Sequence, residues 1–255
     1  MQFSVAGNSD LWLQDLERHS LRRLTFRAGI DRNPVWSPDG VRLVFSHSSG
    51  YGWDLSQQVA ASSGNEEVLV HGGGTILATD WSADGRLVLY NRTEGKTRSD
   101  LWLLPFEGDR KPVPYLQTPF NEEDGHFAPG QARPRWVAYQ SDESGRNEIY
   151  VQALPATGPK YPVSTTGGTN ARWRQDGSEL YYRSADGKIM AVPITLGETP
   201  KVGNPIALFT NSTMDAFEPS RDGQRFLVNL PAGGGTGPSN SITVWTNWEM
   251  GLRKQ

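Results

Sequence analysis

The chain has 255 residues, a formal net charge of −3 and no cysteine. Its 25 basic and 28 acidic residues are interleaved, which argues against a nucleic-acid partner, and the lack of cysteine excludes disulfides and thiolate metal sites. The first six residues contain no basic and apolar segments of the kind found in a signal peptide, and no apolar run approaches the roughly 20 residues that cross a bilayer. We therefore expect no direct membrane insertion by this chain.

The first elements are predicted to be strands. Asp10-Leu11-Trp12-Leu13 alternates in polarity, and a short strand follows at Arg23-Leu24-Thr25. Next comes Trp36-Ser37-Pro38-Asp39-Gly40, followed by the apolar run Leu43-Val44-Phe45. An Asp-Gly turn between two apolar runs predicts a hairpin, because glycine readily adopts the positive φ that the turn requires.

This turn then recurs at a nearly constant spacing. Its copies start at residues 36, 81, 127, 173 and 219, which are 45 or 46 residues apart. Each copy precedes an apolar run, a polar loop, an alternating strand and a short final strand. Four antiparallel strands per period of this length are typical of a propeller blade. The copy at 127–131 has lost its Asp-Gly pair, and we expect a turn there that is about three residues longer.

We predict an all-β fold: one domain, residues 1–255, forming a six-bladed β-propeller of four-stranded antiparallel blades. The first blade is expected to lack its inner strand and the last its outer strand. Residues 1–6 and 241–248 should then lie at an open seam through which the chain could associate. The predicted blades span residues 1–27, 28–72, 73–118, 119–165, 166–211 and 212–250.

The repeated residues are interpreted as structural. Asp before Gly in a tight turn accepts hydrogen bonds from nearby backbone N–H groups, so Asp39 and its repeats are not expected to act as catalytic carboxylates. Trp36, Trp81 and Trp173 occur at a fixed phase of the repeat and are expected to pack between blades. Trp12 and Trp102 are interpreted in the same way, with somewhat more exposure.

The repeat resembles the TolB-like propeller family. The resemblance rests on Trp-Ser-Pro-Asp-Gly before Leu-Val-Phe, on Asp-Leu-Trp-Leu before Arg-Leu-Thr, and on residues 139–151. The stretch 244–254 also resembles the C-terminus of propellers carried by some bacterial receptor-type serine/threonine kinases, as does Thr118-Pro119-Phe120-Asn121-Glu122. That second resemblance implies a sensor domain on the extracytoplasmic, periplasmic side of a membrane. The kinase motifs themselves are absent from this sequence.

We expect no metal site and no cofactor. The four histidines lie at different phases of the repeat, and none has the spacing of a metal-ligand pair. His126 lies just before a predicted inner strand, next to the acidic residues 122–124. Solvated loop residues are the simpler interpretation of that cluster.

The sequence shows no assembled set of nucleophile, base or metal ligands, so we expect no enzymatic activity. We predict a non-catalytic binding or sensor module that presents propeller loops to a protein, a peptide or a small polar ligand. The alternatives are the gating or propeller domain of a peptidase-like or lyase enzyme, and a scaffold with no small ligand. The predicted ligand-binding residues, at the channel mouth where inner strands begin, are Arg32, Asn33, Glu123, Asp124, His126, Thr169 and Asn170.

Overall fold

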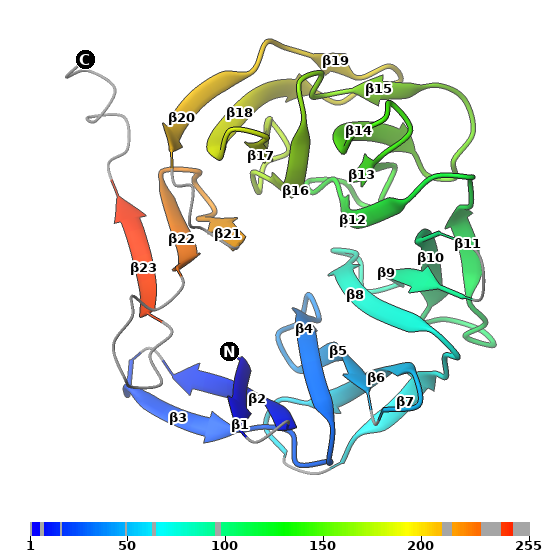
Figure 1. Ribbon diagram of the computed structural model, residues 1–255, viewed down its shortest axis with the longest axis vertical. Coiled ribbons are helices and arrows are strands. Elements are labelled where there is room, and N and C mark those ends of the chain that lie inside the picture. The colour runs from blue at the N-terminus through cyan, green and yellow to red at the C-terminus, as the bar shows by residue number, and fades with distance from the viewer. Residues whose placement is uncertain are drawn as a thin grey trace. The chain divides into compact units, whose positions relative to one another are not determined.

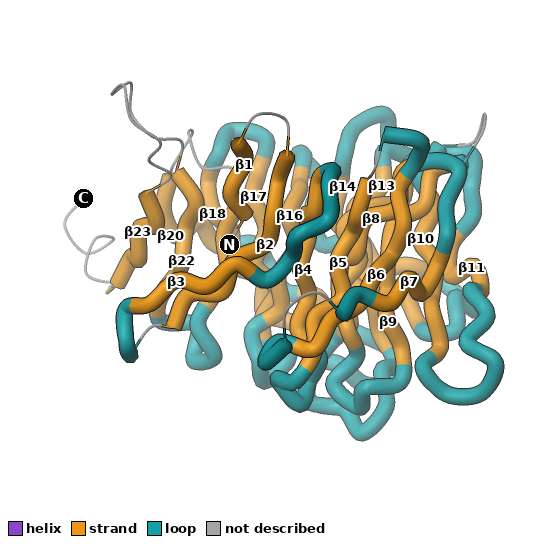
Figure 2. Tube along the Cα trace, turned by 90° about the horizontal axis from the view of Figure 1, so that it is seen from below, coloured by secondary structure: helices purple, strands orange, loops and turns teal. Residues whose placement is uncertain are grey.

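The computed structural model describes residues 2–5, 8–15, 17–48, 50–62, 65–94, 98–210, 216–230 and 241–246. These residues form 23 strands and no helix (Figures 1 and 2). The chain divides into two compact units, residues 1–125 and 126–255, which are described separately below. Residues 231–240, 247 and 248, which carry part of the predicted last blade, lie outside the described residues.

Unit 1 begins with a sheet in the order β1-β2-β4-β5-β6-β7, with β3 paired to β2. The three-stranded set β1–β3 is joined to the next four strands by a single parallel pairing, Ser9 with Ile30. The strands are β1 (Gln2–Val5), β2 (Asn8–Asp15), β3 (Ser20–Arg23), β4 (Ile30–Trp36), β5 (Arg42–Ser48), β6 (Trp53–Val59) and β7 (Glu67–Val70).

The second sheet of unit 1 has the four antiparallel strands expected of one repeat, in the order β11-β10-β9-β8 (Figure 1). They are β8 (Thr75–Trp81), β9 (Leu87–Thr93), β10 (Asp100–Pro105) and β11 (Val113–Leu116).

Unit 2 contains three further sets of strands. The first is β12-β13-β14-β15, the second is β16-β17-β18 with β19 and β20 both paired to β18, and the third is β21-β22-β23. The unit boundary falls within β12. The strands are β12 (Glu122–Phe127), β13 (Trp136–Ser141), β14 (Glu148–Ala153), β15 (Lys160–Pro162), β16 (Gly168–Trp173), β17 (Glu179–Ser184), β18 (Lys188–Thr195), β19 (Lys201–Val202), β20 (Ile206–Thr210), β21 (Ala216–Pro219), β22 (Arg225–Leu230) and β23 (Ser241–Thr246).

The repeated aspartate stabilises the turn after the first strand of a repeat, which we call the inner strand. Asp39 Oδ1 accepts hydrogen bonds from the Ser37 hydroxyl at 2.5 Å and from the Val41 backbone N–H at 3.0 Å. Gly40 has a φ of 69°, a conformation that residues with a Cβ rarely adopt. The same bonds recur at Ser82 and Asp84 and at Ser220 and Asp222. The structural interpretation of these aspartates is therefore confirmed.

The repeated tryptophans are not equivalent. Trp81 is 5% exposed and packs on Phe106, with ring centroids 4.6 Å apart, in a cluster with Val44 and Leu55. Trp173 is only partly buried, and Trp36 is 47% exposed. The expectation that all three pack between blades is therefore wrong for Trp36.

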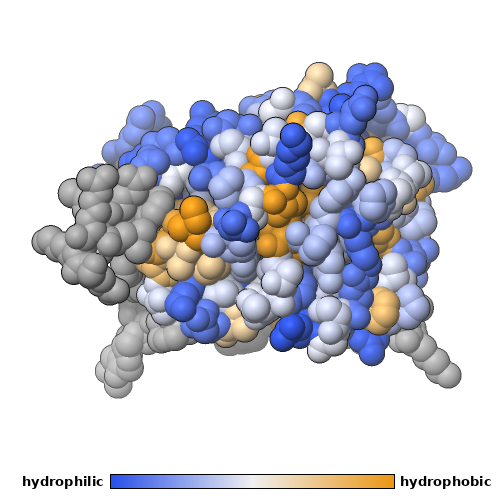
Figure 3. All heavy atoms as spheres, turned by 90° about the horizontal axis from the view of Figure 1, so that it is seen from above, coloured by the Kyte–Doolittle hydropathy of each residue, from blue (hydrophilic) through white to orange (hydrophobic). Residues whose placement is uncertain are grey.

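Each unit has its own apolar clusters. In unit 2, Tyr181, Phe217 and Phe226 form one of them, with the rings of Tyr181 and Phe226 edge to face at 5.1 Å. On the face drawn in Figure 3, exposed hydrophobic side chains form small patches among hydrophilic ones. No helix among the described residues is long and apolar enough to cross a membrane.

Candidate functional site

A left-handed residue interrupts three inner strands at the same position of the repeat. Asn33 in β4 has a φ of 54°, Asp124 in β12 has a φ of 50°, and Asn170 in β16 has a φ of 55°. The pairing register shifts at this point in β4, between Arg32 and Val35, and in β16, where the shift follows Thr169. Such bulges turn side chains away from the regular alternation of a strand, and they are frequent beside functional sites.

The predicted ligand-binding residues therefore lie at structurally equivalent places. Arg32 and Asn33 lie in β4, Glu123 and Asp124 in β12, and Thr169 and Asn170 in β16. Asparagine and aspartate tolerate the left-handed conformation better than other non-glycine residues, so a binding role is not needed to explain their conformation.

Arg32 is held in unit 1 by an aromatic ring. Its guanidinium carbon lies 3.8 Å from the centroid of the Trp53 ring, close enough for a cation–π interaction. Burial lowers the pKa of the Arg32 guanidinium. The buried Nε atom has no hydrogen-bond partner among the described residues. Arg32 is thus a partly exposed cation held against an aromatic ring.

The acidic stretch 122–124 is part of a strand rather than a solvated loop. Glu122 is 2% exposed and accepts a 2.5 Å hydrogen bond from the Thr118 hydroxyl. Asp124 is half-buried, and its backbone N–H donates to Asn91 Oδ1 at 3.2 Å. The solvated-loop interpretation is wrong because these residues lie in strand β12 and Glu122 is buried.

In unit 2, His126 forms a polar chain with two residues that the sequence analysis missed. Arg172 Nη1 lies 2.6 Å from His126 Nε2, and Arg172 Nε lies 3.3 Å from the Glu218 carboxylate. The indole N–H of Trp173 donates to the His126 carbonyl at 3.1 Å. His126, Arg172 and Glu218 each lie one residue before the repeated 127, 173 and 219 positions. Comparing that position across repeats would have found them.

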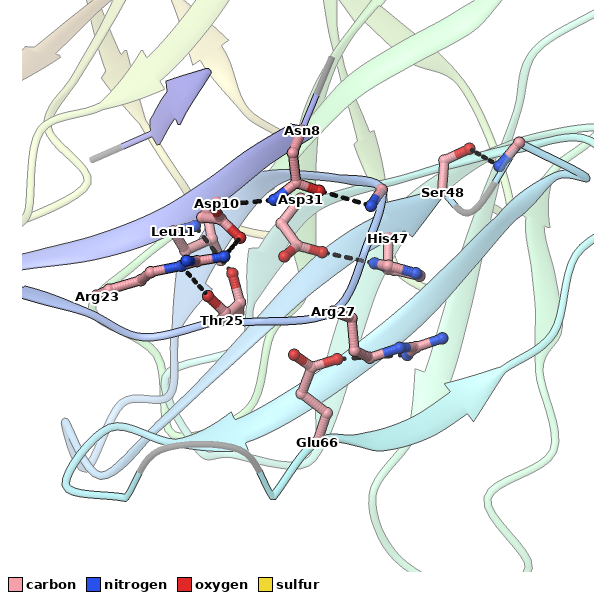
Figure 4. Close-up of polar contacts among 12 residues, drawn as sticks. Asn8, Asp10, Leu11, Arg23, Thr25, Arg27, Asp31, His47, Ser48 and Glu66 are labelled. Carbon is pink, nitrogen blue, oxygen red and sulfur yellow. Dashed lines mark hydrogen bonds and ion pairs between the residues drawn. The ribbon is translucent and has the colours of Figure 1, made fainter. Parts of the chain in front are cut away.

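A second polar cluster surrounds the start of β4 in unit 1 (Figure 4). It consists of Asp10, Arg23, Thr25, Asp31 and His47. Figure 4 shows the Asp31 carboxylate pointing at the His47 ring, whose Nδ1 lies 2.7 Å from Asp31 Oδ1. Both side chains are buried, and Arg23 pairs with Asp10 at 2.8 Å. Burial raises the pKa of the Asp31 carboxyl, and hydrogen bonds from Thr25 and His47 partly offset this effect.

The Asp31–His47 pair is enclosed within unit 1. His47 Nε2 is buried and makes no hydrogen bond within the described part of unit 1. Nearby, Arg27 pairs with Glu66 at 3.3 Å (Figure 4). The cluster fixes the strand that carries Arg32 and Asn33. Across the described residues, no group of three or more His, Cys, Asp or Glu side chains is placed to hold a metal ion.

No protein-family model matches the sequence, and no curated protein sequence is significantly similar to it. Solved structures do match. TolB from Acinetobacter baumannii superimposes with a TM-score of 0.74 at 15% identity, over 95% of this chain and 58% of that chain. This chain thus spans less than two thirds of the length of that protein.

Two kinds of enzyme structure are also similar. An oligogalacturonate lyase in complex with manganese matches with a TM-score of 0.65 at 16% identity, over 96% of this chain and 69% of the lyase. A prolyl endopeptidase structure matches with a TM-score of 0.58 at 12% identity, over 94% of this chain and 39% of that chain. At these identities the similarity establishes the fold and not the activity. The chain therefore has the fold of a TolB-like β-propeller.

Proposed function

We propose that this chain is a non-catalytic binding module whose inner strands present polar side chains to a protein or peptide ligand. The observation that carries the proposal is the left-handed polar residue repeated at Asn33, Asp124 and Asn170. Two of the three strands, β4 and β16, also shift their pairing register at this position, and each of the three strands places an amide or a carboxylate there. Polar groups on a rigid scaffold can fix the orientation of a peptide, whose backbone offers both donors and acceptors.

The residues that precede these positions support the same proposal. Arg32 is a partly exposed cation that Trp53 holds in place, which suits a carbonyl or a carboxylate. Thr169 adds a hydroxyl group and Glu123 a carboxylate. Donors and acceptors are thus mixed, as recognition of a polar chain requires.

The resemblance to receptor-kinase propellers extends the proposal to a sensor on the extracytoplasmic side of a membrane. In that setting, ligand binding to the inner strands would be the sensed event. The sequence immediately upstream in the gene tests this part: a membrane helix and kinase motifs are expected there, and a different domain would contradict it.

An enzyme is the second candidate, because an oligogalacturonate lyase shares the fold. His126 beside Arg172 brings a base and a cation together on neighbouring inner strands. A lyase that cleaves oligogalacturonate by β-elimination forms a product with a conjugated double bond. Incubation with oligogalacturonate and Mn²⁺ should give no increase in ultraviolet absorbance if the binding-module proposal holds.

The proposal can be tested with a random peptide library displayed on phage and panned against the full chain. Enriched peptides are synthesised, and their Kd values are measured by fluorescence anisotropy. In the variant N33G/D124G/N170G, glycine keeps the left-handed backbone and removes the side chains. Because each lost hydrogen bond is worth about 0.5–1.5 kcal/mol, we expect binding to weaken at least about tenfold.

Lys201→Gln provides the control, because Lys201 is an exposed residue of β19, away from the inner strands. Its Kd should equal that of the parent chain. Failure to enrich any peptide, or peptides that respond to Lys201→Gln and not to the glycine variant, would overturn the proposal.

A further inference from the structure

The Trp36 ring, which precedes the first Asp-Gly turn of unit 1, lies open to solvent, whereas its counterpart in the next repeat is covered. Trp81 packs on the Phe106 ring with 4.6 Å between the centroids. The guanidinium carbon of Arg42 lies over both rings, 5.5 Å from the Trp81 centroid and 5.9 Å from that of Phe106. Trp36 is 47% exposed. The next repeat therefore shows, within the same molecule, what fills a site of this kind.

Ala60 occupies the place that Phe106 has in the next repeat. Its backbone N–H donates to the Val41 carbonyl, as the N–H of Phe106 donates to the carbonyl of Arg86. The side chain of Val41 is itself 50% exposed. Because a methyl group stands where the next repeat has a phenyl ring, Trp36, Val41 and Ala60 leave an exposed apolar area, which we call the Trp36 surface.

A cation lies at the edge of the Trp36 surface. Arg22 Nη2 donates a hydrogen bond to the Ala60 carbonyl, so the guanidinium group is held beside the place that a ring would take. In the next repeat, the guanidinium carbon of Arg110 lies 5.4 Å from the centroid of the Phe106 ring. The face of an aromatic ring carries partial negative charge, so a neighbouring cation favours an aromatic side chain over an aliphatic one.

We propose that the Trp36 surface binds an aromatic side chain of a partner protein, which takes the place that Phe106 holds in the next repeat. The incoming ring packs on the Trp36 indole and presents its negative face to the Arg22 guanidinium. This charge complementarity selects the chemical class of the partner residue. The inference goes beyond the proposed function, because Trp36 ends β4 and lies outside the left-handed segment at Asn33 that carries that function.

The charges near the Trp36 surface support a neutral aromatic ligand. Asp39 pairs with Arg42 at 4.0 Å, and Asp15 pairs with Arg18 at 4.0 Å, so these charges are matched locally. Arg22 makes no ion pair with a carboxylate in the part of unit 1 that the structure describes. A ring face satisfies this single cation without bringing a charge that the neighbouring Asp39 would repel.

The test titrates the nitrogen-15-labelled full chain with N-acetylphenylalanine amide, an uncharged probe. The indole N–H signal of Trp36, assigned by its loss in Trp36→Phe, and the Nε–H signal of Arg22 report on the surface in nitrogen–proton NMR spectra. We expect both signals to shift and to saturate. N-acetylcyclohexylalanine amide has a ring of similar size without a π face, and it should bind about two- to fivefold more weakly.

Two variants test the site from within the chain. Ala60→Phe supplies the ring that the next repeat already has, so it should abolish binding of the probe and raise the melting temperature. Ala207→Phe is the matched control, because it adds the same ring at an exposed position of β20 in unit 2 and should bind the probe as the parent does. Arg22→Gln should remove the preference for the phenylalanine probe over the cyclohexylalanine probe.

Equal binding of the two probes by the parent chain, or unchanged binding by a folded Ala60→Phe variant, would overturn the inference. If Ala60→Phe does not fold, Arg22→Gln decides, and a preference that persists in this variant would contradict the inference. Sedimentation that shows a dimer of the parent and a monomer of Ala60→Phe would assign the surface to a second copy and would also overturn it.

Discussion

His47 Nδ1 lies 2.7 Å from Asp31 Oδ1, and both side chains are buried at the start of β4. Burial raises the pKa of Asp31, so the folded state disfavours its ionised form. Below the pKa of about 3.9 that Asp31 has in the unfolded chain, the carboxyl is protonated in both states and costs the fold nothing. As the pH rises through the higher pKa of the folded state, the buried carboxyl must ionise, and the folded state loses stability relative to the unfolded one.

We therefore predict that Asp31→Asn gains stability relative to the parent chain between pH 4 and pH 7. Asparagine can still accept the His47 hydrogen bond, but it carries no charge to desolvate. Urea unfolding at several pH values measures the difference in the free energy of unfolding between the two chains.

Asp39→Asn is the matched control, because its pKa shift has the opposite sign. Hydrogen bonds from Ser37 and Val41 lower the pKa of exposed Asp39, so its contribution is present at neutral pH and is lost as the pH falls through the folded pKa. Near pH 7, Asp39→Asn should have a lower free energy of unfolding than the parent chain. In acid, the two free energies of unfolding should become nearly equal. Parallel pH profiles for the two variants would contradict the assignment.

Trp81 and Trp36 occupy the same position of the repeat but differ in burial. Replacing each with alanine should therefore lower the free energy of unfolding by different amounts. Trp81→Ala removes a buried ring that packs on Phe106 and should cost roughly 3–5 kcal/mol. Trp36→Ala should cost less than half as much, because nearly half of that side chain is exposed, 47%. Urea unfolding followed by far-ultraviolet circular dichroism gives both values. Equal costs would show that Trp36 is buried in solution.

The left-handed conformation of Asn170 predicts an unusual order of stabilities. Asn170→Gly should be more stable than Asn170→Ala by roughly 1–2 kcal/mol, because a Cβ is unfavourable at a φ of 55°. The adjacent Thr169 lacks this conformation, so Thr169→Ala should be more stable than Thr169→Gly. Thermal unfolding of the four variants tests both orders, and the same order at both positions would exclude the bulge.

The repeat predicted from the sequence was enough to establish strands and turns. The Ser-x-Asp-Gly turns form from hydrogen bonds between residues at most five positions apart, as between Ser37 and Arg42, so local chemistry determines them. The all-β propeller fold is confirmed. The count of six blades is compatible with the strand sets and stays a prediction, as do the blade ranges and the open seam.

The exposure of Trp36 depended on a more distant residue. The backbone N–H of Phe106 donates to the Arg86 carbonyl. In the preceding repeat, the backbone N–H of Ala60 donates the equivalent bond to the Val41 carbonyl. An alanine there has no ring to cover Trp36. Inspecting that position in each repeat would have predicted the difference between Trp36 and Trp81.

The contacts of the candidate site were less accessible from the sequence. Arg172 and His126 are 46 residues apart, and their contact depends on the distance between neighbouring strands. The place of the three left-handed positions in the repeat is enough to predict them as ligand-binding residues. Their backbone conformation could not be inferred, because asparagine and aspartate also occupy ordinary strand and turn positions.

The most direct test of the binding proposal is a photo-cross-linking measurement. A panned peptide carrying a benzophenone group is irradiated with the full chain, and the attachment sites are located by mass spectrometry. The proposal predicts cross-links to residues of the inner strands β4, β12 and β16. Cross-links confined to the outer strands β7, β11, β15 and β20 would contradict it.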